Sequence, residues 1–263
     1  MRPAPGRLDA VLWDVDGTLA ETERDGHRVA FNMAFEDCGL PWRWDEARYG
    51  RLLRITGGRE RLMHDMQDRA DAPRVPSERD ALARDVHRRK NRHYEELVQG
   101  GRIALRPGVI ELVDECRSAG VRLAIATTTS RSNVAALLGV HLGPDWSATF
   151  EVVVCGEDVR HKKPDPEAFV LAMSRLGVGA VGAVAVEDSP GGVAAARGAG
   201  CPVVVTRSSY FMDDPIEGAI AIGPGLHSRA GWHPALPGTG VGRVTLADIA
   251  HWHALQDTVS SYP

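Results

Sequence analysis

Residues 8–18 read LDAVLWDVDGT, a short apolar run that ends in two aspartates, a glycine and a threonine. The run over residues 8–13 is typical of a buried strand. Asp14 and Asp16 follow it at positions i and i+2, so their side chains point to the same face. Two carboxylates this close must share a cation or raise a pKa. Mg²⁺ accepts oxygen ligands of this kind, so the stretch predicts a charged, metal-binding end to a strand.

This stretch also matches two other patterns. Asp-Gly pairs are common in turns, and Gly17 allows the chain to turn sharply beside the charged group. Asp-x-Asp-Gly also begins calcium-binding loops, which need a glutamate at the twelfth position. Counting from Asp14, that position is Asp25, so the calcium loop is excluded.

Downstream of residue 105 the pattern alternates between apolar strands and helices, which predicts a parallel sheet covered on both faces. We expect strands at residues 121–126, 150–155, 181–186, 203–206 and 219–222. We expect helices at residues 107–119, 132–138, 166–176, 191–199 and 246–255, the last capped by Thr245. In such sheets the active site lies beyond the carboxyl ends of the strands.

Residues 22–99 differ, because they are charged and carry apolar residues at helical spacing. They predict four or five helices and no sheet, with Ser77 as the N-cap of one of them. The basic run at residues 88–92 is interpreted as a solvated helix face. The fold class is therefore α/β, a Rossmann-like parallel sheet with an inserted small helical cap domain. We expect a core domain at residues 1–20 and 101–263 and a cap domain at residues 21–100.

Bulk properties exclude several functions. A net charge of −4 argues against a nucleic-acid-binding surface. The sequence has no apolar run near the ~20 residues that span a bilayer and no apolar signal-peptide core at its start. The four cysteines are far apart and lack zinc spacing, and Cys116, Cys155 and Cys201 are expected to be buried. A cytoplasmic protein without nucleic-acid or membrane partners is expected.

Three further polar groups follow predicted strands. Thr127-Thr128-Thr129 comes after residues 121–126 and suits a phosphate oxygen, although one threonine could simply cap a helix. Lys162-Lys163 precedes Pro164, and the chain has only one other lysine, Lys90. Because the chain uses arginine elsewhere, lysine at this position indicates a need for a compact positive charge. Glu187-Asp188 ends an apolar strand, where the pair offers metal ligands or, for Asp188, a helix cap.

These motifs, in this order, resemble the haloacid dehalogenase superfamily, with a helical insertion like that of its phosphoglycolate phosphatase and β-phosphoglucomutase branch. The stretches at residues 14–23, 30–32, 56–61 and 126–130 resemble the CbbY proteins, which dephosphorylate xylulose-1,5-bisphosphate, an inhibitor of Rubisco in the Calvin cycle. The resemblance covers residues 8–20 and 105–206 of the core. It implies an Mg²⁺-dependent phosphatase acting through a phospho-aspartate.

The resemblance also implies roles for single residues. Asp14 is the nucleophile, Asp16 the general acid and base, and Thr127 and Lys163 hold the transferred phosphoryl group. Lys163 is preferred to Lys162 because the family's lysine directly precedes proline. Asp14, the backbone carbonyl of Asp16, and Asp188 bind Mg²⁺ with Glu187 alongside.

Substrate-binding candidates are Glu23, His27 and Arg61 in the helical insertion and Thr128 in the core. Each of the three insertion residues could equally be a surface helix residue. Arg59 and His27 come after Arg61 as ligands for a second phosphate.

Alternatives stay open. β-Phosphoglucomutase uses the same residues to move phosphate within a sugar, and a broader sugar-phosphate or phosphoglycolate phosphatase would share them too. A binding module that lost catalysis is disfavoured because Asp14, Asp16, Lys163 and Asp188 are all present. A monomer is favoured. Residues 207–263 fall largely outside the resemblance and are assigned only packing or partner contacts.

Overall fold

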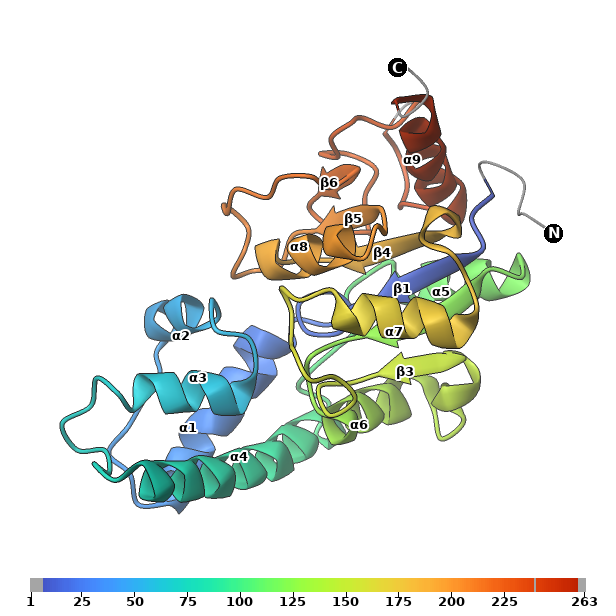
Figure 1. Cartoon of the computed structure of the whole chain (residues 1–263). Coiled ribbons are helices and arrows are strands. Elements are labelled where there is room, and N and C mark those ends of the chain that lie inside the picture. The colour runs from blue at the N-terminus through green and yellow to red at the C-terminus, as the bar shows by residue number, and fades with distance from the viewer. Residues whose placement is uncertain (1–6, 239, 260–263) are drawn as a thin grey trace.

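A computed structural model describes residues 7–238 and 240–259 (Figure 1). Within these residues the chain forms a six-stranded parallel sheet in the order β3-β2-β1-β4-β5-β6. The strands are β1 (Ala10–Trp13), β2 (Arg122–Ala126), β3 (Val152–Val154), β4 (Ala183–Glu187), β5 (Val203–Thr206) and β6 (Ala221–Gly223). Together with the helices that surround the sheet, they confirm the predicted α/β class.

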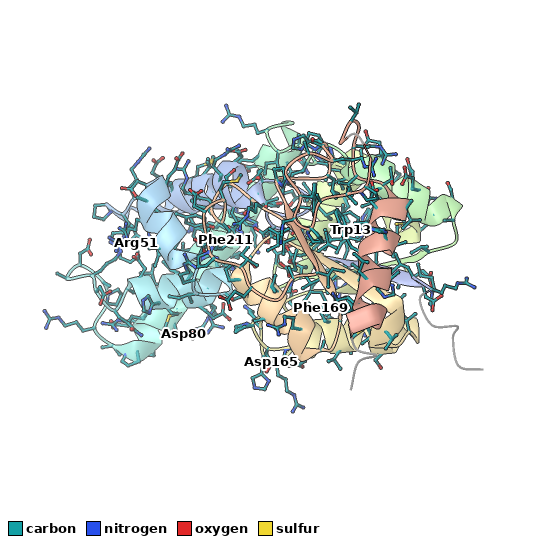
Figure 2. All side chains as sticks on the ribbon, turned by 90° about the horizontal axis from the view of Figure 1, so that it is seen from above. Trp13, Arg51, Asp80, Asp165, Phe169 and Phe211 are labelled. Atoms are coloured by element: carbon teal, nitrogen blue, oxygen red, sulfur yellow. The ribbon has the colours of Figure 1, made fainter. Side chains whose placement is uncertain are left out.

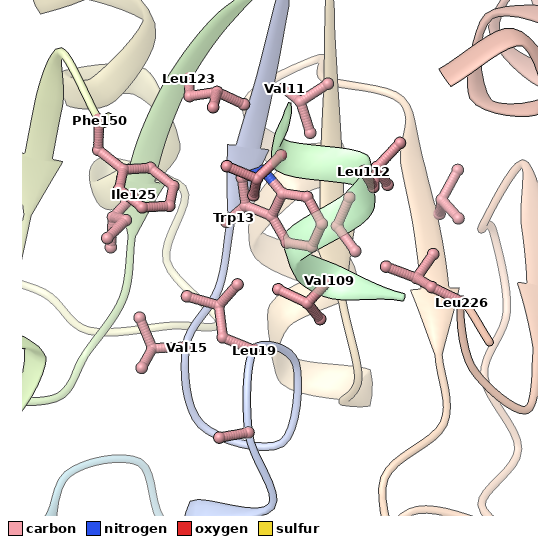
Figure 3. Close-up of a cluster of buried hydrophobic side chains, with 14 of the residues drawn as sticks. Val11, Trp13, Val15, Leu19, Val109, Leu112, Leu123, Ile125, Phe150 and Leu226 are labelled. Atoms are coloured by element: carbon pink, nitrogen blue, oxygen red, sulfur yellow. The ribbon is translucent and has the colours of Figure 1, made fainter. Parts of the chain in front are cut away.

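Helices cover both faces of the sheet. One face carries α5 (Val109–Ser118), α6 (Arg131–Leu142) and α9 (Leu246–Val259), and the other carries α7 (Glu167–Leu176) and α8 (Pro190–Gly198). Two 3₁₀ turns lie in connections of the sheet: η2 (Trp146–Ala148) between α6 and β3, and η3 (Ala180–Gly182) between α7 and β4. Successive β1 side chains alternate between the faces, as strand geometry requires. Val11 and Trp13 enter the hydrophobic cluster formed with α5, α6 and α9 (Figure 3). Ala10 and Leu12 enter the hydrophobic cluster formed with α7 and α8.

Residues 21–100 form a helical segment beyond the carboxyl ends of the strands (Figure 1). It contains a π-helical turn η1 (Glu23–His27), α1 (Arg28–Asp37), α2 (Glu46–Leu52), α3 (Gly58–Asp65) and α4 (Pro76–Gln99). Its aromatic residues pack into a separate cluster around Phe31, Trp44 and Tyr49. The chain leaves and re-enters the sheet side by side, because Ala20 pairs with Leu105 in an antiparallel bridge.

The predicted elements are found with ends shifted by a few residues. The N-cap prediction for Ser77 is wrong: α4 begins at Pro76, whose fixed φ and missing N–H suit the first helical position. The cap at Thr245 is confirmed, since its hydroxyl accepts a hydrogen bond from the Asp248 backbone N–H at 3.3 Å. Cys116, Cys155 and Cys201 are buried, as predicted. No helix within residues 7–238 and 240–259 combines the length and apolarity needed to span a membrane.

Candidate active site

A cavity of about 470 Å³ lies between the carboxyl ends of the strands and the helical segment. Its core side is lined by residues from the predicted strand-end motifs, namely Asp14, Asp16, Thr128, Lys163 and Asp188. Thr127 and Glu187 are buried next to these residues in the chain but are not part of the lining. The parallel strands thus bring together side chains that are far apart in the chain, such as Asp14 and Asp188, which are separated by 174 positions.

Lys163 on the core side contacts two carboxylates. Its Nζ donates to Asp14 Oδ1 at 2.7 Å and to Glu187 Oε1 at 2.6 Å. Burial raises the pKa of Asp14 to about 7, while the charge of Lys163 acts in the opposite direction. Lys162 points elsewhere, with its Nζ 2.7 Å from Glu60 Oε1 in the helical segment. The lysine before proline is therefore the one that contacts Asp14.

Asp14, Glu187 and Asp188 form a buried acidic cluster. Each offers one carboxylate oxygen, and these oxygens lie within 4.8 Å of one another. Burial, together with the charges of Asp14 and Glu187, raises the pKa of Asp188 well above its usual value. Gly17 has φ 87° and leaves room for the Asp188 carboxylate, which a Cβ at that position would overlap. Three crowded oxygen donors with excess negative charge fit a hard divalent cation such as Mg²⁺.

Asp16 is held by two partners from the start of the helical segment. Its Oδ1 accepts from Thr22 Oγ1 at 2.6 Å and lies 2.9 Å from His27 Nε2. Burial raises the pKa of Asp16, but the charge and hydrogen bond of His27 and the Thr22 hydroxyl outweigh it and lower the pKa. His27 is itself fixed by stacking on Tyr94, with 4.3 Å between the ring centroids. In this arrangement Asp16 is ionised, with one carboxylate oxygen anchored.

The helical segment contributes a second polar group to the cavity. Arg61 donates to the Tyr49 hydroxyl at 2.7 Å, and that hydroxyl donates to Glu23 Oε2 at 2.5 Å. Arg61 Nη2 lies 3.6 Å from Glu23 Oε1. Glu23, His27 and Arg61, the three candidates from the sequence, all line the cavity. Tyr49 links two of them, but no motif in the sequence singled it out.

Lys90 corrects the interpretation of the basic run at residues 88–92. Its side chain is not solvated, since the residue is only 3% exposed, and it lines the cavity. Its Nζ lies 5.5 Å from the Phe31 ring centroid and 5.2 Å from that of Tyr94. The buried positions of α4 are Ala83, Val86, Lys90, Tyr94, Leu97 and Val98. Helical spacing from Val86 to Tyr94 places Lys90 on the apolar stripe, and this was the signal that could have found it.

Comparisons with known proteins agree with this geometry. Residues 8–200 match the family model of the haloacid dehalogenase-like hydrolases. The chain is 42% identical to the plasmid-borne protein CbbY of Cupriavidus necator over 251 residues, covering 94% of this chain and 97% of that protein. It is 32% identical to a phosphorylated carbohydrates phosphatase of Thermotoga maritima over 193 residues, 73% of this chain and 82% of that one.

A solved structure is similar as well. It is a CbbY variant from Rhodobacter sphaeroides in complex with xylulose-1,5-bisphosphate, with a TM-score of 0.75 and 41% identity. The match covers 81% of this chain and 92% of that one. The chain therefore belongs to the haloacid dehalogenase-like hydrolase family and is an enzyme of the phosphatase type.

Proposed function

We propose that this enzyme is an Mg²⁺-dependent phosphatase that hydrolyses a small sugar phosphate, xylulose-1,5-bisphosphate foremost, through a phospho-aspartate at Asp14. The observation that carries the proposal is the buried contact between Lys163 and Asp14 at the floor of a cavity that residues of the helical segment help to line. The named ligand of the similar CbbY structure supports the choice of substrate. Residues 21–100 then act as a cap domain over a core made of residues 1–20 and 101–263.

In this mechanism Asp14 attacks the phosphorus in line with the leaving sugar oxygen. By the resemblance to the family, Lys163 and Thr127 hold the transferred group, with Thr127 buried next to the lining residue Thr128, and Thr128 binds the group from the cavity wall. Asp16 protonates the leaving oxygen and then activates water against the phospho-aspartate. Because Asp16 is ionised in the resting arrangement, it takes up its proton when the negative charge of the substrate arrives beside it.

The acidic cluster has the donors to hold Mg²⁺ through Asp14, the backbone carbonyl of Asp16, and Asp188, with Glu187 alongside. A bound Mg²⁺ neutralises charge on the phosphoryl oxygens. Glu187 already accepts from Lys163, so it orients the lysine as well as adding charge beside the cluster. Lys163 in turn separates the Asp14 and Glu187 carboxylates.

A mutase would use the same core residues, so the products must decide between the two activities. The test is phosphate release from a panel of sugar mono- and bisphosphates with Mg²⁺. We expect inorganic phosphate to be released, with xylulose-1,5-bisphosphate giving the highest kcat/KM. Accumulation of an isomeric sugar phosphate without free phosphate would support β-phosphoglucomutase activity instead.

Arg61→Ala is expected to lower kcat/KM for xylulose-1,5-bisphosphate by roughly ten- to a hundred-fold, because a charge-assisted contact to the distal phosphate is lost. Activity on p-nitrophenyl phosphate should hardly change, since that ester has no second phosphate. Steady-state assays of the same variant on both substrates check this. Because Arg61 also supports Tyr49 and Glu23, equal losses on both substrates would show that its role is structural.

Lys90 makes the binding of a bisphosphate sensitive to pH. Burial lowers its pKa from 10.5 to about 8, although Asp16 and Glu23 act in the opposite direction. The ammonium form exists below that pKa, so kcat/KM for the bisphosphate should fall as the pH rises through about 8. A pH profile of wild type and Lys90→Met measures this. The variant should have lower activity and lack that limb, and an unchanged limb would remove Lys90 from substrate binding.

A further inference from the structure

The cap side of the cavity is lined by the loop between α2 and α3 and by the start of α3. This segment is ion-paired to the core at both of its ends. At one end, Arg54 Nη1 lies 2.6 Å from Asp214 Oδ2, and Arg54 Nη2 donates to Asp214 Oδ1 at 3.0 Å. At the other end, Lys162 Nζ donates to Glu60 Oε1 at 2.7 Å. The cap therefore presents a cation at one end and an anion at the other.

The two core partners, Asp214 and Lys162, follow strands that lie on opposite sides of β1 in the strand order. Asp214 lies in the loop between β5 and β6, and Lys162 lies in the loop between β3 and α7. In the strand order, β3 lies on one side of β1 and β5 lies on the other. Since Asp14 directly follows β1, the two ion pairs bridge cap and core on both sides of the nucleophile.

The loop between β5 and β6 has further contacts with the cap. The Tyr210 ring packs 5.7 Å from Tyr49, and Phe211 joins the aromatic cluster of the helical segment. Figure 2 shows Phe211 between the sheet and the helical segment. The Arg54 guanidinium lies over the Phe211 ring at 5.7 Å. At the core end of the loop, Ser208 is buried and lies beside Gly17 together with Asp188, so one short segment joins the acidic cluster to the cap.

We propose that Arg54–Asp214 and Glu60–Lys162 form a clasp that holds the cap closed over Asp14 and so positions the cap residues against substrate. The inference rests on the proposed function only for its kinetic consequence. The two pairs have opposite polarity, which favours one orientation of the cap on the core. In a reversed orientation Arg54 would face Lys162 and Glu60 would face Asp214, so that like charges would meet. Arg54 and Glu60 are 58% and 47% exposed, so the clasp opens readily for ligand entry and product release.

The direct test is hydrogen–deuterium exchange of backbone amides at residues 53–58 in the whole protein without substrate. Asp214→Arg and Arg54→Asp should each speed this exchange by about three- to ten-fold, and the double variant should return it close to wild type. Glu60→Lys and Lys162→Glu form a second such cycle. Glu151→Lys, which reverses a charge in the core-internal pair with Arg122, is the matched control and should leave this exchange unchanged.

Double variants that fail to restore slow exchange in either cycle would overturn the clasp. Kinetics separate it from direct substrate binding by Arg54, which also lines the cavity. The clasp predicts that Asp214→Asn and Arg54→Gln lower kcat/KM for the bisphosphate by similar factors. A loss in Arg54→Gln alone would instead assign Arg54 to the substrate. Because the exchange measurement needs no substrate, an inactive wild type would refute the proposed function while leaving the clasp standing.

Discussion

Asp14→Asn is expected to lower kcat by about four orders of magnitude or more, on every phosphate ester that the wild type hydrolyses. The amide has nearly the volume of the carboxylate but cannot form the acyl phosphate. The fold should survive, because Lys163 keeps its hydrogen bond to Glu187 at 2.6 Å. Phosphate release measures the loss, and thermal melting measures the fold.

Asp9→Asn is the matched control, since Asp9 lies just before β1 and Asp14 just after it, at the opposite end of the same strand. Its carboxylate is 3.1 Å from Arg7 and takes no part in the cavity lining. This variant should retain wild-type turnover. Wild-type activity in Asp14→Asn, with the control equally active, would show that the nucleophile is another group.

Chelation with EDTA should abolish activity, and added Mg²⁺ should restore it. The physical reason is the cluster of Asp14, Glu187 and Asp188. Its crowded negative charge is only partly neutralised by the ammonium of Lys163. Asp188→Ala removes one oxygen ligand and should raise the Mg²⁺ concentration for half-maximal activity by at least about ten- to a hundred-fold. Calcium should support turnover poorly, because its looser coordination misaligns the attack.

A second readout for the metal does not depend on turnover. Mg²⁺ that binds the folded state should raise the melting temperature of wild type in proportion to ln(1 + [Mg²⁺]/Kd). Asp188→Ala should show little of this shift. Full activity in a chelated sample, or equal melting shifts in both proteins, would exclude the metal assignment.

The core side of the site was predictable because apolar runs locate strands, and parallel strands bring their carboxyl ends to one edge. Each polar group after a strand was therefore a candidate for the same site. The positions of Asp14 and Asp188 around one cavity follow from that rule, whereas the choice of Lys163 over Lys162 came from the resemblance to the family. Strand ends were less certain, since backbone pairing and not side-chain pattern decides where a strand stops.

The cap side was harder to predict, because helices carry no equivalent of a shared edge. The hydrogen bond from Tyr49 of α2 to Glu23 of η1 joins residues 26 positions apart, and nothing local in the sequence specifies it. Lys90 could have been found by applying to it the argument used for Lys162 and Lys163, that lysine is rare in this chain. Its place on the buried stripe of α4 was visible as well.

Residues 207–263 were assigned only packing or partner contacts, and for the loop between β5 and β6 the structure adds contacts with the cap. Asp214 meets a residue 160 positions earlier in the chain. No periodicity or motif encodes a pairing of this kind, because it depends on how the cap is placed over the sheet. Such long-range contacts are the part of the site that required a structure.

The central claim is that phosphate passes through a covalent bond to Asp14, and chemical trapping tests it most directly. The enzyme is mixed with xylulose-1,5-bisphosphate and Mg²⁺, quenched in acid within one turnover, and reduced with borohydride, which converts an acyl phosphate to an alcohol. Mass spectrometry of the peptide spanning residues 8–23 should then show homoserine at position 14, dependent on both substrate and Mg²⁺. An unmodified Asp14 under conditions in which phosphate is released, or homoserine at position 16 instead, would contradict the account.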